Sequence, residues 1–511
     1  MFNHIDNFLN RITMYRLVLY YLSGLLGFAV IFSAAGILPH NPLSLLTSAA
    51  LMLIISYAVN FIFVRVFEAH DNTESVYITA LILALIIVPP ATLFPLDTSV
   101  LPILIWAPIF AMASKFIFAI GKKHLFNPAA LAVALTALVV NQSATWWVGR
   151  SLSLSPLIFF GGLLIVRKIQ REGMIAAFFI AAATSIVLTT SGIGDPLVSL
   201  GKAALYTPTF FFAFVMLTEP LTTPPTRVPR LIYGVLVGAL FASNINILGV
   251  YFTPEVALLV GNVFSYFVSP KWKEVLRLKE VKEIGADIYD FVFTTDKKIN
   301  FRPGQYLEWT LKGEKPDSRG NRRYFTLASS PTENEIRMGV KFYPKPSSFK
   351  KYLSALKPGD TIAASNLAGD FILPGNKNKK LVFIAGGIGV TPFRSMIKYL
   401  LDRNEKRDIT IIYSAKSPKE FAYMDIFEEA KEKLGIKTIY CISDSPNVPE
   451  GWAGPVGIVD MALIVKEVPD FKDRTFYVSG PRSMTTSFED NLKKTGVPGR
   501  RIRVDFFPGF A

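Results

Sequence analysis

Apolar stretches separated by short polar turns make up most of the first 270 residues. Ten such stretches can be drawn, the first at Tyr15–Leu38 and the last at Pro254–Val268. A helix that spans the hydrocarbon core of a membrane needs about 20 apolar residues. We therefore predict a polytopic α-helical membrane domain with about 10 transmembrane helices. Several stretches are shorter than this or are interrupted by proline, which indicates re-entrant or discontinuous helices.

After residue 270 the pattern becomes that of a water-soluble protein. Short strand-like segments, such as Ile288–Thr294 and Tyr306–Leu311, are separated by turns that contain proline and glycine. From Leu381 onward, apolar strands alternate with amphipathic helices. This alternation predicts a doubly wound parallel α/β sheet, in which ligands bind at the carboxyl ends of the strands.

A glycine-rich turn follows the first strand of this α/β region, Leu381–Ala385. Glycine allows a ligand to approach the backbone closely, and a helix N-terminus offers free N–H groups and a positive dipole end to a pyrophosphate. A plain tight turn is the alternative interpretation. The residues of this candidate nucleotide site are Gly386, Gly387, Gly389 and Thr391.

Arg322–Pro331 carries an arginine, an aromatic ring and a hydroxyl at alternate positions, which share one face of a strand. Such a face offers a guanidinium to a phosphate and a ring to a flat cofactor. Ser347, Ser348 and Lys350 open a short helix and predict a second phosphate-binding turn. The strand-then-glycine pattern recurs at Ser479–Met484. The chain ends on an aromatic tail, Asp505–Ala511, which either packs internally or lies against an exposed cofactor ring.

Charge separates the two halves of the chain. Residues 1–270 contain 13 Lys and Arg against 9 Asp and Glu, whereas the remainder contains 41 against 30. A basic soluble half favours anionic lipid headgroups or a phosphorylated cofactor, and a solvated surface without a partner is the alternative. Basic residues at the ends of the apolar stretches fall mostly on one side: only Arg150 and Lys202 fall on the other. The positive-inside rule therefore predicts a multi-pass protein of the cell (inner) membrane, with both termini and the soluble half cytoplasmic.

Cysteine and histidine are scarce. The one cysteine, Cys441, excludes a disulfide and a four-thiolate iron–sulfur cluster within the chain. We expect it to be a small buried residue. The four histidines are His4, His40, His70 and His124, and we expect no metal site and no nucleic-acid partner.

Two polar, proline-containing stretches interrupt the apolar half, at Gly121–Ala129 and Thr218–Arg227. Each precedes a predicted helix start and would hold a cofactor or a quinone headgroup. The alternative is that the prolines only end helices and that Glu219 pairs with Arg227. Polar groups at a membrane boundary are costly unless protein or ligand satisfies them, which favours the functional interpretation.

From about residue 272 to its end, the chain resembles the ferredoxin–NADP⁺ reductase superfamily. The motifs occur in the family's order: an RxYS-like motif at Arg323–Thr326, GGxGxTP at Gly386–Pro392 and a late C-G-P-x-M motif as Ser479–Met484. The resemblance implies an antiparallel β-barrel that binds FAD or FMN, followed by a nicotinamide-binding lobe. With the apolar half, this gives three domains: 1–270 transmembrane, 271–376 FAD-binding and 377–511 NAD(P)-binding.

The resemblance also implies roles for individual residues. Arg323 would contact the flavin phosphate, Phe325 would stack where the family usually has tyrosine, and Thr326 would lie near the flavin N5. Ser479 replaces a cysteine often found beside the nicotinamide. We therefore take Thr326, Ser479 and Phe510 as candidate catalytic residues. The candidate cofactor-binding residues are Arg323, Tyr324, Phe325, Thr326, Ser347, Ser348, Lys350, Gly386, Gly387, Gly389, Thr391, Gly480, Pro481, Met484 and Phe507.

Residues 1–270 resemble the membrane subunits shared by the Rnf complex (its D subunit) and the Na⁺-translocating NADH:quinone reductase (its B subunit). The matching pieces are Phe126–Ala129 and Thr218–Pro224. Those relatives hold flavins, one of them attached covalently to threonine. The resemblance therefore implies a second flavin, FMN or riboflavin, near Thr218–Thr226. Covalent attachment at Thr145 is the less favoured possibility.

Together these features predict a membrane-bound, flavin-dependent NAD(P)H oxidoreductase. Electrons would pass from cytoplasmic NAD(P)H through FAD to a membrane flavin or quinone, with ion coupling left open. The expected partners are membrane lipid and a quinone or a membrane-embedded redox partner subunit. Two alternatives are a haem-type transmembrane ferric reductase or oxidase and a transporter with a redox-sensing, reductase-like domain. Lys416 favours a 2′-phosphate and hence NADPH, although the choice between NADH and NADPH stays open.

Overall fold

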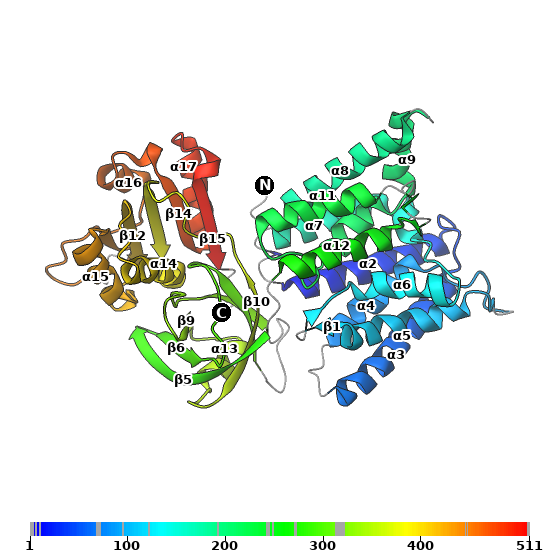
Figure 1. Cartoon of the computed structure of the whole chain (residues 1–511), viewed down its shortest axis with the longest axis horizontal. Helices are drawn as coiled ribbons and strands as arrows, with labels where there is room; N and C mark the ends of the chain where they lie inside the picture. Colours follow the sequence, from blue (N-terminus) through cyan, green and yellow to red (C-terminus); the bar gives the residue numbers. More distant parts are fainter. Residues whose placement is uncertain are drawn as a thin grey trace. The chain divides into compact units, whose positions relative to one another are not determined.

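Figure 1 shows the computed structural model of the protein. It describes all residues except 1–4, 6–7, 10–11, 68–72, 95–96, 121–122, 192–193, 242–245, 248–249, 270–272, 312–321, 445, 447 and 508–511. The chain divides into two compact units, Met1–Trp272 and Lys273–Ala511. We call them the helical unit and the reductase unit.

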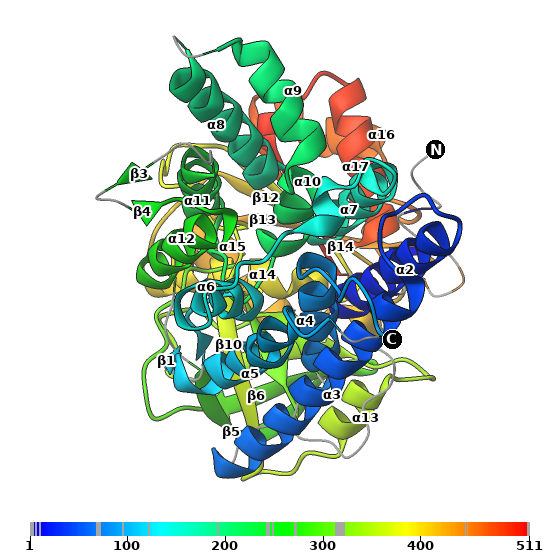
Figure 2. The ribbon, with the colours of Figure 1, turned by 90° about the vertical axis from the view of Figure 1, so that its right-hand side faces the viewer.

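The helical unit contains α-helices of very different lengths, together with two short hairpins. In this unit α3 lies against both α4 and α5, and α8 lies against α11 (Figure 2). Its helices are α2 (Met14–Ala34), α3 (Pro42–Val66), α4 (Thr73–Ile86), α5 (Leu101–Ile117), α6 (Pro128–Val139), α7 (Ser155–Ile169), α8 (Glu172–Thr190), α9 (Pro196–Tyr206), α10 (Thr209–Phe211), α11 (Arg227–Leu240) and α12 (Pro254–Val268). The hairpins are β1 (Ala119–Ile120) with β2 (Lys123–His124), and β3 (Asn246–Ile247) with β4 (Val250–Tyr251).

The prediction of about 10 transmembrane helices is wrong for the described part of the chain. By length and composition, three helices there are long and apolar enough to cross a membrane: α2, α3 and α8. A fourth is reached if α9 and the following segment Thr209–Met216, bent by 67° at a break, count as one span. Four further apolar helices, α4, α5, α6 and α12, have only 10–17 residues, fewer than the roughly 20 that a span needs.

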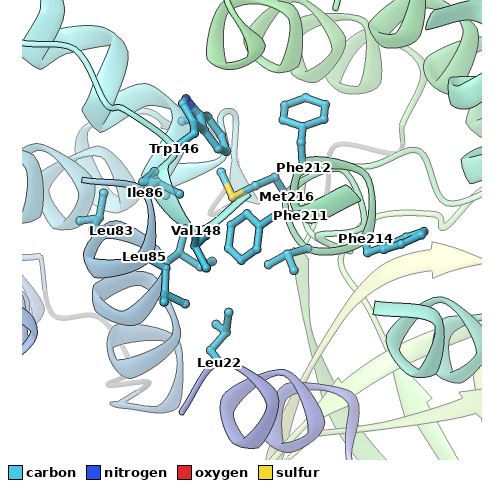
Figure 3. Packing of buried hydrophobic residues seen from close by; sticks show 14 of the residues in the cluster. Leu22, Leu83, Leu85, Ile86, Trp146, Val148, Phe211, Phe212, Phe214 and Met216 are labelled. Carbon is cyan, nitrogen blue, oxygen red and sulfur yellow. The ribbon is translucent and has the colours of Figure 1, made fainter. Parts of the chain in front are cut away.

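Helix α4 shows how such a short helix is accommodated. It ends at Ile86, shortly before two prolines, and its last carbonyl groups would be costly if left unpaired in an apolar interior. The Trp146 N–H donates to the Ile86 carbonyl at 2.7 Å, and the Trp147 indole donates to the carbonyls of Ala84 and Ile87 at 3.1 Å each. Figure 3 shows Trp146 and Ile86 near Phe212 in the apolar core.

The reductase unit begins with a six-stranded antiparallel sheet in the order β8-β7-β10-β5-β6-β9. The strands are β5 (Lys273–Gly285), β6 (Ile288–Thr294), β7 (Tyr306–Thr310), β8 (Arg322–Thr326), β9 (Ile336–Lys341) and β10 (Thr361–Ala368), and the short helix α13 (Ser348–Ser354) follows β9. We call this part, with its connecting loops, the antiparallel lobe.

A five-stranded parallel sheet follows, in the order β13-β12-β11-β14-β15. Its strands are β11 (Leu381–Gly386), β12 (Ile409–Ala415), β13 (Lys437–Ile442), β14 (Thr475–Pro481) and β15 (Ile502–Phe507). Its helices are α14 (Thr391–Asp402), α15 (Met424–Leu434), α16 (Met461–Glu467) and α17 (Arg482–Lys494). We call this part the parallel lobe. The predicted order, an antiparallel sheet and then a parallel α/β domain, is confirmed.

Apolar side chains cover both faces of the parallel sheet. Phe393 of α14 and Phe427 of α15 belong to the core on one face, and Phe488 of α17 belongs to the core on the other. Strands buried on both faces explain the continuous apolar run at Leu381–Ala385. Cys441 on β13 is buried within this sheet, and its thiol donates to the Gly457 carbonyl at 3.4 Å.

Candidate functional site

The glycine-rich turn lies at the carboxyl end of β11, beside the corresponding turn after β14. Ala385 on β11 is in register with Ser479 on β14, so both turns leave the same edge of the sheet. A Cβ atom on Gly389 would lie 2.5 Å from the Ser479 carbonyl oxygen. Gly387 differs, because it has a φ of +52° and an added Cβ would meet nothing within 4 Å. One glycine thus lets two turns approach each other, and the other supplies a left-handed turn with open space beside it.

The turn after β14 contributes a buried hydroxyl. Ser479 is fully buried, and its Oγ has no hydrogen-bond partner among the described residues. Met484 closes the turn from α17, since a Cβ on Gly386 would lie 2.4 Å from its sulfur atom and 3.2 Å from Pro481. Buried polar atoms are normally satisfied, so an orphaned hydroxyl at this edge is the kind of group that a bound ligand would satisfy.

Strand β8 presents different residues on its two faces. Arg323 is buried, its guanidinium lies 5.4 Å from the Phe349 ring of α13, and the Phe325 ring lies 5.8 Å from the same ring. Tyr324 lies on the other face and donates to Glu308 at 2.7 Å. Arg322 also bonds to Glu308, at 3.2 Å. The acid on β7 therefore engages Arg322 and Tyr324, whereas Arg323 and Phe325 face α13.

Helix α13 brings the predicted second phosphate-binding turn to this place. The Ser347 hydroxyl caps the helix by accepting from the Lys350 N–H at 3.4 Å. The Lys350 ammonium donates to the Lys341 carbonyl at 2.8 Å and lies 4.6 Å from the Tyr343 ring. Ser348 is the first residue of α13. Arg323 and the start of α13 thus come together, as a shared role in phosphate binding requires.

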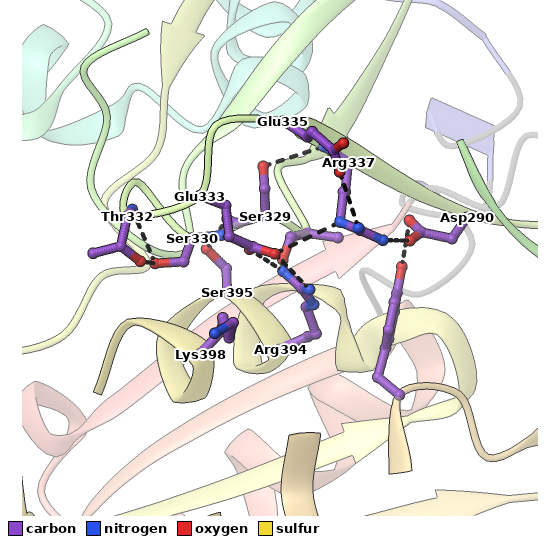
Figure 4. Close-up of polar contacts among 12 residues, drawn as sticks. Asp290, Ser329, Ser330, Thr332, Glu333, Glu335, Arg337, Arg394, Ser395 and Lys398 are labelled. Carbon is purple, nitrogen blue, oxygen red and sulfur yellow. Dashed lines mark hydrogen bonds and ion pairs between the residues drawn. The ribbon is translucent and has the colours of Figure 1, made fainter. Parts of the chain in front are cut away.

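Helix α14 joins the two lobes. Figure 4 shows Arg394 and Ser395 of α14 pointing toward the loop that follows β8. Arg394 donates to the Ala328 carbonyl at 3.0 Å and forms an ion pair with Glu333, and the Ser395 hydroxyl donates to the Ser329 carbonyl at 2.6 Å. Thr326, which is buried at the end of β8, lies two residues before Ala328. The loop that follows Thr326 is therefore bonded to α14, the helix that begins at Thr391 directly after the glycine-rich turn.

Two candidate residues at the C-terminus are only partly described. Phe507 is the last residue of β15, where its backbone is in register with Pro481, but its side chain lies outside the described residues. Phe510 lies outside them altogether. Their predicted contact with a cofactor ring stays a prediction.

In the helical unit the two polar stretches meet. The Asn127 side chain donates to the Glu219 carboxylate at 2.8 Å, and the Thr222 hydroxyl donates to the same oxygen at 3.1 Å. Asn262 of α12 accepts from the Asn127 N–H at 2.8 Å and donates to the Tyr233 hydroxyl at 3.2 Å. Segments more than 90 residues apart in the chain thus form one buried polar cluster.

Sequence reasoning missed Asn262 in this cluster and a buried lysine elsewhere in the helical unit. Lys115 is buried in α5 and donates to Ser75 and Thr79 of α4 at 3.0 Å each. A single lysine inside an apolar stretch was the signal available in the sequence. Asn262 gave a weaker signal, since one asparagine in a helix is common. Thr145, the candidate for covalent flavin, donates its hydroxyl to the Ile86 carbonyl at 3.3 Å.

Comparisons with known proteins bear on the reductase unit. Residues 383–490 match the family of oxidoreductase NAD-binding domains. A flavohemoprotein of Candida albicans is 29% identical over 251 residues, covering 46% of this chain and 60% of that protein. A glycine betaine monooxygenase reductase subunit of Pseudomonas aeruginosa is 26% identical over 238 residues, covering 46% of this chain and 64% of that protein. The chain thus spans less than two thirds of the length of these relatives.

Solved structures give matches of similar extent. The flavohem-like FAD/NAD-binding domain of nitric oxide dioxygenase from Vibrio cholerae matches with a TM-score of 0.41 at 22% identity, over 46% of this chain and 98% of that one. The cytochrome b5 reductase domain of Ulva prolifera nitrate reductase matches with a TM-score of 0.40 at 22% identity, over 46% and 97%.

By sequence, the reductase unit is similar to oxidoreductases, and residues 383–490 within it are similar to their NAD-binding domain. These matches are consistent with the NAD(P)H-dependent flavin oxidoreductase that the sequence predicted.

Proposed function

We propose that the whole chain is a membrane-bound oxidoreductase that takes electrons from cytoplasmic NAD(P)H through FAD and passes them to a flavin or quinone in the membrane. The observation that carries the proposal is the lobe junction, where α14 joins the glycine-rich turn to the end of β8. Two half-sites on separate sheets are held together there, as hydride transfer between two bound cofactors requires.

The residues present fit a nicotinamide nucleotide at the parallel lobe. The N-terminus of α14 supports pyrophosphate binding at Gly387 and Thr391, because its free N–H groups and positive dipole end face the carboxyl edge of the sheet. The orphaned hydroxyl of Ser479 would gain a partner from the carboxamide end of the nucleotide. Gly480, Pro481 and Met484 hold the backbone that carries Ser479.

The residues of the antiparallel lobe fit FAD. Arg323 and the Ser347–Ser348 turn would hold its phosphates, Phe325 would lie against its ring system and Thr326 would hold a ring nitrogen in place. Flavin, when bound, converts two-electron into one-electron chemistry. Burial of Thr326 and Ser479 would exclude water from the reacting atoms.

The helical unit would provide the acceptor site. The buried cluster around Asn127 and Glu219 supports a second flavin or a quinone headgroup near Thr218–Thr226, because it keeps polar groups fixed in an otherwise apolar unit. Three candidate spanning helices support a cell-membrane location, with membrane lipid and a quinone or a redox subunit as partners. The resemblance to the Rnf and Na⁺-translocating membrane subunits supports the same role, and coupling to ion movement is compatible with it.

The positions of the histidines bear on one alternative, a haem-type ferric reductase. Axial haem ligands require paired histidines on membrane helices. Of the two histidines in the described residues, His40 follows α2 in a turn and packs at 4.9 Å against Trp147, and His124 lies on β2. This placement favours the flavin-to-acceptor route over a haem route.

The test is an anaerobic titration of the detergent-purified full chain. We expect a flavin spectrum that NADH or NADPH bleaches and that a soluble quinone then restores. Comparing the two nucleotides also decides which of them is used. Haem absorption bands would instead support the ferric reductase, and a colourless protein that takes up no added FAD would support a transporter with a redox-sensing domain.

A further inference from the structure

The loop between β12 and α15, residues 416–423, makes hydrogen bonds and an ion pair to the antiparallel lobe. It leaves the carboxyl end of β12, the edge of a parallel sheet where a nucleotide binds. The Ala286 N–H, at the β5–β6 turn, donates to the Lys419 carbonyl at 2.7 Å. Lys341 of β9 forms an ion pair with Glu420 at 2.7 Å. The third contact, from Tyr423, is the most buried.

Tyr423 has an unusual backbone conformation, and its hydroxyl and its ring both contact other residues. Its φ of +58° lies in the left-handed region, which a bulky side chain enters only when its surroundings over-determine the conformation. Its hydroxyl donates to Asp290 of β6 at 3.0 Å, and Asp290 also accepts from Arg337 at 2.8 Å. The Arg394 guanidinium lies 5.6 Å from its ring centre. Both lobes therefore hold this one side chain.

The antiparallel lobe is shaped to receive Tyr423. A Cβ atom on Gly339 of β9 would lie 2.7 Å from the Tyr423 hydroxyl oxygen, so even alanine would displace the ring there. Asp290 is buried, and an uncompensated carboxylate at this depth would be costly. Burial, and then the Asp290 charge, raise the pKa of Tyr423 well above its ordinary value. The Tyr423 hydroxyl therefore stays protonated near neutral pH and can act as the donor in this hydrogen bond.

We infer that Tyr423 is a positioning residue, which sets the nucleotide-binding loop 416–422 against the flavin-binding lobe so that the nucleotide is bound in register with the flavin. The inference rests on the proposed function. A helix start at Met424 does not itself require a tyrosine in a strained conformation, since asparagine or glycine adopts φ > 0 at lower cost. The strain persists because the ring and hydroxyl are anchored on the other lobe.

The experiment compares Tyr423→Phe with Tyr477→Phe in the full chain. Tyr477 is a buried tyrosine whose hydroxyl donates to the Ile372 carbonyl at 2.7 Å, so its variant also loses one buried hydrogen bond but leaves loop 416–422 alone. For Tyr423→Phe we expect the KM for the nucleotide to rise about fivefold to tenfold, with kcat and FAD content nearly unchanged. For Tyr477→Phe we expect a similar drop in Tm and a wild-type KM.

Two further measurements separate the possible failures. Lys341→Met removes a second fastening of the same loop at a less buried position, and we expect it also to raise the KM, which covers the case that Tyr423→Phe does not fold. A wild-type KM in both loop variants, with only Tm lowered, overturns the inference. If NAD(P)H does not bleach the flavin of the unaltered protein, the proposed function fails instead.

Discussion

Gly386, Gly387 and Gly389 are glycine for different physical reasons. Gly386 makes room for the Met484 side chain, and Gly389 makes room for the Ser479 backbone. Only Gly387 combines a left-handed φ with open space. At the residue scale, a motif that looks like one ligand-binding device therefore divides into two packing positions and one turn position.

Alanine substitutions should separate these roles. Gly389→Ala would press a Cβ against the Ser479 carbonyl, which belongs to backbone that cannot rotate away, and we expect flavin bleaching by nucleotide to be largely lost while FAD is retained. Gly387→Ala meets no atom and costs about 1–2 kcal/mol of backbone strain. We expect it to lower Tm and, because its Cβ would enter the space proposed for the pyrophosphate, to weaken bleaching without abolishing it. Stopped-flow absorbance with each variant checks both expectations, and equal activity would contradict them.

The elements on which the site residues lie could be predicted from the sequence, but the contacts between those residues could not. Strand β11 and its glycine turn were predictable because buried apolar runs and glycine have local causes. The Tyr423–Asp290 hydrogen bond joins residues 133 positions apart, and neither the residue types nor their spacing predicts such a pair. The alternation along β8 was visible, but Glu308 as the partner of Arg322 and Tyr324 depends on strand pairing with β7.

At the scale of elements, ion pairs join the amino ends of the parallel strands, which lie opposite the edge proposed to bind the nucleotide. Arg474, just before β14, pairs with Asp408, just before β12, at 2.6 Å and with Asp470 at 2.7 Å. Lys380, just before β11, pairs with Asp470 at 2.7 Å. These contacts join the starts of three strands, at the edge of the sheet opposite the glycine-rich turn.

Asp470→Asn should reveal this network through pH. The hydrogen bond from Arg474, followed by that from Lys380, lowers the pKa of Asp470 to about 2. The stabilisation is therefore present above the ordinary carboxyl pKa and is lost as the pH falls through about 2. At pH 7 we expect the variant to be less stable by about 1 kcal/mol, allowing for solvent screening. The difference in Tm should shrink toward pH 2, with nucleotide KM unchanged at pH 7; a constant difference would contradict this.

The helical elements show where element-scale prediction failed. Counting apolar stretches predicted about 10 spans, but α4 and α6 are short because Pro89–Pro90 follows one and Asn127–Pro128 begins the other. A stretch's hydropathy does not reveal whether its helix ends inside the protein. That depends on partners such as the Trp146 N–H and the Trp147 indole, which come from a loop 60 residues away.

At the scale of the whole molecule, each unit has a core of its own. The helical core and the cores around the parallel sheet are separate clusters, and the chain divides between Trp272 and Lys273. Separate cores allow units to fold independently. The chemistry is expected to divide in the same way, with electron entry in one unit and exit in the other.

Expression of residues 273–511 alone tests this division. We expect a soluble, yellow protein that oxidises NAD(P)H with ferricyanide at a rate close to that of the full chain, because both half-sites lie in the reductase unit. We expect no reduction of a long-chain quinone in liposomes, which the full chain should carry out. Quinone reduction by the isolated unit would show that the helical unit is not needed for the acceptor step.

Cys441 has a practical consequence. Burial raises the pKa of its thiol, and the thiolate is the form that reacts with maleimides and thiosulfonates. The natural protein should thus be nearly unreactive toward thiol reagents without any engineering. A cysteine introduced on an exposed position of each unit would accept a spin label or a fluorophore against almost no background. Distances between the two units could then be followed as nucleotide is added.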